Sequence, residues 1–240
     1  MKKTKLILTS LIMAAAVSMT FMGCDPNPAQ PDPTSDPDPD PTPVKKAEDD
    51  VFFLPVEDIF SITDNETNIT STVITGKIKT GKVKLGDKVQ LIGMGKVYET
   101  EVAGIEMFRK QLSEAEAGDN VGIQLKDESI TKSDVKRGMA LITPDSRKQH
   151  KKFTAEVYLR TQDEGGRSNP ISSGFRPQIY LNTTDITGEL TFEGTINPGD
   201  TATVTIDLIY PMPIKEGDEF VIREGGRNVT TVSTIKEILD

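Results

Sequence analysis

The sequence predicts an all-β protein, because two patterns that are typical of strands and tight turns recur along it. Apolar and polar residues alternate with a period of two at 153–159 and again at 202–208, as expected for half-buried strands. Tight turns are expected ahead of several strand-like runs, since glycine can adopt the positive φ that such turns need. Gly-Asp pairs mark these turns at 86–87, 118–119, 199–200 and 217–218.

Helical periodicity is nearly missing from the sequence. No long stretch repeats every 3.6 residues, and only 107–117 leans towards a helix. About ten short strands at a spacing of about 8–12 residues are typical of sandwiches or closed barrels.

A break in the strand pattern divides the folded part of the chain. Pro144, Asp145 and Ser146 end one series of strands before the run that starts at Phe153. We therefore expect two domains, at 51–145 and 146–240. Each is long enough for a small barrel, whose closure removes exposed sheet edges.

The N-terminus has the features of a secretory signal. Lys2, Lys3 and Lys5 precede an apolar run at 6–21, and Gly23-Cys24 follows it. This end resembles the bacterial lipobox, which implies a signal peptide at 1–23 and a diacylglyceryl group on Cys24. An ordinary signal peptide is the alternative, as is an uncleaved anchor, although the run is shorter than the ~20 residues of a spanning helix. Two or three acyl chains on Cys24 would hold the protein on a membrane.

The segment 24–50 is rich in proline and aspartate. Alternating prolines favour polyproline II, and like charges extend the chain further, so we expect a spacer between the lipid and the folded part. Plain disorder without a spacer role predicts the same composition.

Composition excludes several kinds of site. Cys24 is the only cysteine, so lipidation leaves no thiol for a disulfide, a zinc site or a nucleophile. His150 is the only histidine and lies in the basic run 147–152, which does not suit a general base. We predict no catalytic residue, metal site or cofactor. The formal net charge of −9 also disfavours nucleic acid as a partner.

Seven colinear blocks resemble the second and third domains of bacterial elongation factor Tu. The blocks are FLPVEDIFSI at 53–62, GIEMFRK at 104–110, AGDNVG at 117–122, DEGGR at 163–167, GFRPQ at 174–178, TTDITG at 183–188 and REGGR at 223–227. The resemblance runs from about residue 52 to the end of the sequence. It implies two consecutive six-stranded β-barrels.

In that family the barrels follow a GTPase domain. No Gly-x-x-x-x-Gly-Lys-Ser/Thr loop occurs in this sequence, and the signal and the spacer stand where that domain would be. Without a phosphate-binding loop there is nothing to position GTP for hydrolysis. We therefore expect no enzymatic activity and no bound nucleotide.

The resemblance also implies positions that contact aminoacyl-tRNA in the family. Those in the first barrel are Glu57, Asp58, Phe60 and Asn120 for the aminoacyl pocket, with Arg137 near the tRNA 5′ end. Those in the second barrel are Arg167, Gln178, Thr187, Gly225 and Gly226, for the T stem.

Several neighbouring positions depart from the family pattern. Ser168 replaces a histidine, Asn182 an arginine and Phe175 a tyrosine, and the longer segment 63–71 replaces a Gly-Arg-Gly turn. Purely structural roles are the alternative explanation of the matches: glycines that need positive φ, packing of Phe60 in the barrel, and pairing of Arg176 with a local carboxylate at a contact between the barrels.

These observations favour a lipid-anchored binding module of the cell envelope or cell surface, attached to the inner or outer membrane through Cys24. Its expected ligand is an unidentified protein or glycan, met at 63–71 or around Arg167, Arg176 and Arg227. One alternative is a translation-related protein that binds aminoacyl-tRNA or acts with a separate GTPase chain. Another is a structural envelope protein without a specific ligand.

Overall fold

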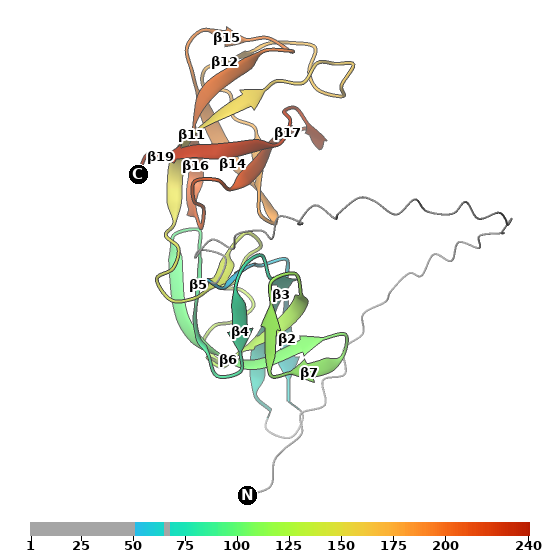
Figure 1. Ribbon diagram of the computed structural model, residues 1–240, viewed down its shortest axis with the longest axis vertical. Coiled ribbons are helices and arrows are strands. Elements are labelled where there is room, and N and C mark those ends of the chain that lie inside the picture. The colour runs from blue at the N-terminus through green and yellow to red at the C-terminus, as the bar shows by residue number, and fades with distance from the viewer. Residues whose placement is uncertain (1–50, 65–67) are drawn as a thin grey trace, which may run out of the picture. The chain divides into compact units, whose positions relative to one another are not determined.

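The computed structural model describes residues 51–64 and 68–240, and in this part of the chain every regular element is a β-strand (Figure 1). The predicted all-β class is therefore confirmed. The predicted signal peptide, Cys24 and the Pro/Asp-rich segment lie outside the described residues, as do 65–67 of the predicted loop.

Ten strands precede residue 143. They are β1 (Phe53–Pro55), β2 (Asp58–Thr63), β3 (Thr70–Lys77), β4 (Lys82–Lys84), β5 (Lys88–Gly93), β6 (Lys96–Met107), β7 (Lys110–Leu112), β8 (Glu114–Glu116), β9 (Asn120–Leu125) and β10 (Ala140–Ile142). Their main sheet has the order β1-β10-β5-β6-β9-β3-β2, with β7 paired to β6, and β4 pairs with β8.

This first sheet curls so that β1, at one end of the strand order, meets the segment that follows β3. One side of β1 pairs with β10, so that Phe53 lies opposite Ile142. On its other side, the Phe53 N–H donates to the Thr80 carbonyl at 3.1 Å and the Lys79 N–H donates to the Phe53 carbonyl at 2.9 Å. A short bridge just beyond β3 thus closes the sheet.

Nine strands follow. They are β11 (His150–Tyr158), β12 (Ile171–Ser172), β13 (Gln178–Leu181), β14 (Thr184–Thr191), β15 (Thr195–Ile196), β16 (Thr201–Met212), β17 (Glu219–Glu224), β18 (Arg227–Asn228) and β19 (Ser233–Ile238). The order β13-β14-β16-β11-β19-β17 returns to β13 through the β13–β17 pairing. The second half is therefore a closed six-stranded barrel, as the resemblance implied.

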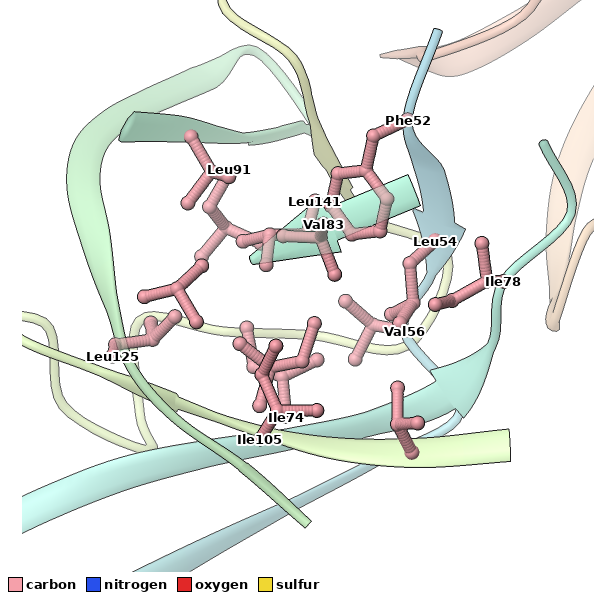
Figure 2. Packing of buried hydrophobic residues seen from close by; sticks show 14 of the residues in the cluster. Phe52, Leu54, Val56, Ile74, Ile78, Val83, Leu91, Ile105, Leu125 and Leu141 are labelled. Atoms are coloured by element: carbon pink, nitrogen blue, oxygen red, sulfur yellow. The ribbon is translucent and has the colours of Figure 1, made fainter. Parts of the chain in front are cut away.

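Each half encloses its own hydrophobic core. In the first, Val121, Ile123 and Leu125 of β9 point inward and alternate with more exposed residues, which is the predicted period of two. Figure 2 shows how Phe52, Leu54 and other apolar side chains of this cluster pack together. In the second core the rings of Phe153 and Phe220 meet edge to face with centroids 5.4 Å apart.

The four Gly-Asp turns share one geometry. Each glycine has a φ between 85° and 102°. The aspartate that follows accepts a hydrogen bond from the N–H three residues earlier; these bonds are Lys84 N to Asp87, Glu116 N to Asp119, Asn197 N to Asp200 and Lys215 N to Asp218. The bonds from Asn197 hold the pKa of Asp200 below its ordinary value. These turns confirm that the repeated dipeptide starts strands.

The helical tendency at 107–117 was misleading. This stretch contains β7 and β8 instead, which pair with β6 and β4. Leu112 lies opposite Ile105, and Ala115 lies opposite Val83 in the first core. Distant strands therefore decide the conformation of a segment whose local pattern is ambiguous.

The two halves touch through a few buried polar contacts. The Thr183 hydroxyl, in the β13–β14 turn, donates to the Val56 carbonyl at 2.5 Å and accepts from the Gly138 N–H at 3.1 Å. Arg147 donates to Asp218 at 2.5 Å, and its guanidinium lies 3.8 Å from the centre of the Phe53 ring. The chain between β10 and β11 is thereby held against both halves.

Gly138 is the position at which this junction tolerates no side chain. Its φ is 87°, and an added Cβ would lie 2.2 Å from the Thr184 Cγ2 atom and 3.0 Å from the Met212 Cε atom. Gly86 has nearly the same φ, 85°, but no atom within 4 Å of an added Cβ. Comparing alanine substitutions at these two glycines therefore distinguishes the free-energy cost of backbone strain from that of a steric clash.

We expect Gly138→Ala to destabilise the protein more than Gly86→Ala. Both substitutions incur about 1 kcal/mol for a positive φ, and Gly138→Ala adds an overpacking cost of about 1–3 kcal/mol. Urea unfolding of the two variants measures the difference. Equal midpoints would show that the junction relaxes around a methyl group.

Candidate binding faces of the two domains

Four of the five matched residues of the first domain lie on or beside one outer face. Asp58 lies opposite Thr75, Thr75 opposite Gly122, and Gly122 opposite Glu106, so one row crosses β2, β3, β9 and β6. A second row on the same face runs from Phe60 through Val73 and Gln124 to Gly104.

Phe60 does not pack into the core. Its side chain is 44% exposed, whereas its neighbour Ile59 is buried. Asn120 is exposed at the start of β9, two residues before Gly122 on the same face. Glu57 is half-buried between β1 and β2, and its N–H donates to the Thr75 carbonyl at 2.8 Å. The predicted group is thus brought together, and we call Asp58, Phe60, Glu106 and Asn120 the first outer face.

Glu106 is a member of this face that sequence reasoning did not select, although it lies inside the block 104–110. Burial raises the pKa of its carboxyl group, and the nearby Arg109 partly offsets this effect. The Asp58 carboxylate instead accepts the N–H of Ile59 at 2.8 Å. The face therefore carries two carboxyl groups in different environments, one of them partly desolvated.

Arg137 lies apart from this group. Its exposed side chain follows β9 by a long loop and directly precedes Gly138, at the junction between the domains. A contact there would involve both halves of the protein.

The matched residues of the second domain form a second outer face. Gln178 of β13 lies between Thr187 of β14 and Arg223 of β17, and its Nε2 atom donates to the Thr187 hydroxyl at 3.0 Å. Arg223 donates to both oxygens of Asp185, at 3.0 and 2.9 Å, and its guanidinium lies 5.5 Å from the centre of the Tyr180 ring. Sequence reasoning did not select Arg223, Asp185 or Tyr180 as site residues.

Arg167 joins a loop to this face. Its guanidinium pairs with Glu224, its Nε atom donates to the Asn169 carbonyl at 3.2 Å, and it lies 5.0 Å from the centre of the Phe175 ring. Upstream in the same loop, the Thr161 N–H and the Tyr158 hydroxyl bind Glu164 and hold its pKa below the ordinary value. Hydrogen bonds therefore order the loop that presents Arg167.

The glycines at the rim of this face have a structural explanation. Gly225 and Gly226 form the β17–β18 turn with φ values of 57° and 82°, and an added Cβ at either would meet only open space. Their backbone conformation requires glycine, so their presence does not by itself indicate a ligand.

Three arginines on or beside the second face are paired with carboxylates. Arg223 pairs with Asp185, Arg167 with Glu224, and Arg176 with Glu189, whose carboxylate accepts from the Arg176 Nε atom at 2.8 Å. Arg176 thus meets a local carboxylate as expected, but Glu189 belongs to the same barrel, so the pair is not the expected contact between barrels. A phosphate group would have to compete with three existing ion pairs.

Other kinds of site find no support in the described residues. No group of three or more His, Cys, Asp and Glu side chains is placed to bind a metal ion in 51–64 and 68–240. His150 contacts the carbonyl of Asp240 through its Nδ1 atom at 2.9 Å, away from both faces. This part of the chain also contains no helix long and apolar enough to cross a bilayer.

The partly desolvated Glu106 predicts a pH effect on stability. The pKa of Glu106 is raised in the folded protein. The contribution of this group to the free energy of unfolding therefore falls as pH rises from the ordinary glutamate range to the folded pKa. A glutamine at this position would not titrate, so the stability of Glu106→Gln relative to wild type should increase between about pH 4 and about pH 7. Chemical denaturation at both values measures this, with Glu99→Gln of the same strand as the control for charge. A relative stability that falls with pH would contradict the prediction.

Comparison with protein-family models agrees with this architecture. The model described as elongation factor Tu domain 2 matches residues 71–142. The model described as elongation factor Tu C-terminal domain matches residues 146–239. Together the matches cover more than half of the 240 residues and almost all of the described strands. The chain therefore belongs to the elongation factor Tu family, through that factor's second and third domains.

Proposed function

We propose that this protein is a lipid-anchored binding module of the cell envelope, in which the two barrels hold a protein or glycan ligand without GTP chemistry. Three features support the proposal. The two matches are to barrel domains, the N-terminus resembles a lipobox at Cys24, and the two outer faces expose aromatic, carboxyl and amide groups. These groups suit hydrogen-bonded and stacking contacts with a protein or a sugar.

The observation that carries the proposal is the internal pairing of the second outer face. Nucleic-acid affinity comes mainly from cations that replace the counterions of phosphates. Arg167, Arg176 and Arg223 each pair with a carboxylate of their own barrel, so a phosphate bound there would have to compete with that carboxylate for the guanidinium. Three of its arginines are therefore engaged with carboxylates, and exposed Arg227 is the other arginine of the predicted region.

A second candidate function is binding of aminoacyl-tRNA, alone or with a separate GTPase chain. It is favoured by the grouping of Asp58, Phe60 and Asn120 on one face and by the Gln178–Thr187 hydrogen bond on the other. It is opposed by the net charge of −9 and by the predicted export signal.

Lipid anchoring is tested by comparing wild type with Cys24→Ala in cell fractions. We expect the wild-type protein to be acylated at residue 24, membrane-bound and sensitive to protease on intact cells or spheroplasts. The mutant should lose the acyl group and leave the membrane fraction, because one covalent site carries both chains. Ser35→Ala, in the spacer, is the matched control and should behave as wild type. A full-length, cytoplasmic wild type would refute the anchoring proposal.

Filter binding with aminoacyl-tRNA at low salt separates the two candidate functions. We expect a Kd no better than about 100 µM, the range of non-specific contact. Gln178→Ala should leave this value unchanged, as should Thr187→Ala. A Kd below about 1 µM that weakens steeply with salt would make tRNA binding the better proposal.

A further inference from the structure

The hairpin that joins β6 to β7 ends in an unusual turn. Met107 lies opposite Lys110, and the two residues between them, Phe108 and Arg109, have φ values of 50° and 64°. Two consecutive residues at positive φ form the turn type that favours Asn-Gly, because a Cβ is unfavourable in this region. An aromatic residue and an arginine therefore occupy a turn that suits neither of them.

The unfavourable backbone conformation of Phe108 is not offset by packing of its side chain into the core. It is 86% exposed and is the most exposed of the large hydrophobic side chains in the described residues. Met107 and Leu112, on either side of it in the hairpin, pack against the first core instead. Arg109 and Lys110 are also exposed, and neither forms an ion pair within the described part of the chain. We call Phe108, Arg109 and Lys110 the hairpin tip.

The surroundings of the tip are polar. Glu106 lies opposite Gln111 in the same hairpin, and exposed Asn120 lies opposite exposed Lys77 on the neighbouring strands. A stable protein interface buries about 800 Å² per partner around an apolar centre, which is more than the hairpin tip alone can supply. A bilayer surface needs less, since one aromatic side chain with adjacent cations can enter the headgroup region.

We propose that the hairpin tip is a membrane-contact site: Phe108 enters the headgroup region of an anionic bilayer while Arg109 and Lys110 bind lipid phosphates. Binding through this site would hold the first barrel against the membrane surface. It rests on the proposed lipid anchoring for its place in the cell, because the anchor would keep the tip close to a bilayer.

The charge around the tip is mixed, since the Glu106 carboxyl group lies near Arg109. Lys84 and Glu114, on the nearby β4–β8 pair, form an ion pair at 3.3 Å, so this glutamate is already neutralised. Attraction between a basic group and an anionic surface acts within about a Debye length, so the groups nearest to the lipid dominate.

Flotation with vesicles tests the site without the anchor. Both cores are built from residues 52 onward, so a chain that starts at residue 24, with Cys24→Ser, contains the whole described fold. We expect it to float with phosphatidylglycerol/phosphatidylethanolamine vesicles but not with phosphatidylcholine vesicles. Phe108→Ala should weaken binding about tenfold, and Arg109→Gln with Lys110→Gln by a similar factor.

Matched variants control for general effects of composition and folding. Leu85→Ala removes another exposed apolar side chain, 47% exposed, and Lys132→Gln with Lys136→Gln removes two other cations; neither should alter flotation. The variant with Phe108→Asn and Arg109→Gly suits the turn. It should unfold at the same or a higher urea concentration than wild type and yet lose flotation.

Two results would overturn the membrane-contact site. One is a wild-type chain that does not float with anionic vesicles. The other is equal flotation of the wild type, Phe108→Ala and Leu85→Ala chains. Either result would indicate that a protein pocket, and not a bilayer, is the partner of the apolar tip. Neither bears on acylation of Cys24, which the cell-fraction experiment decides by itself.

Discussion

The relation between the two barrels depends on one close backbone approach. Gly138 comes so near to Thr184 that no side chain fits, and Thr183 fills the remaining polar gap by bonding both Val56 and Gly138. Since a buried carbonyl or N–H without a partner costs about 1–3 kcal/mol, this small network restricts how the domains can meet. Arg137 lies directly beside it, so the position of the one matched residue between the faces follows from the same contact.

Much of the fold could be predicted because its signals are local. Alternation along 202–208 reports which side of β16 is buried, and each Gly-Asp turn contains both the positive φ and its own hydrogen-bond acceptor. The segment 107–117 could not be predicted in this way. Its two strands are three residues each, too short for a period to show, and their partners lie elsewhere in the sequence.

In the candidate sites, too, local sequence could predict some features and not others. Resemblance found Phe60, Asn120 and Gln178, and the structure brings the first two to one face and the third to another. The ion pair of Arg223 with Asp185 joins residues 38 positions apart, and the desolvation of Glu106 depends on packing. No local pattern carries such information, which is why these ion pairs and the desolvation of Glu106 could be found only from the structure.

The fold requires glycine at some positions of the candidate faces and of the junction, but not at all of them. Gly225 and Gly226 need a positive φ, and Gly138 leaves no space, so the fold alone explains these residues. Gly122 has neither property: its φ is ordinary, and an added Cβ would lie 3.4 Å from a Val73 methyl group. Backbone geometry does not demand glycine at this position. The missing side chain between Asp58 and Glu106 leaves the row open at this point of the first outer face, which neither the backbone conformation nor a close contact requires.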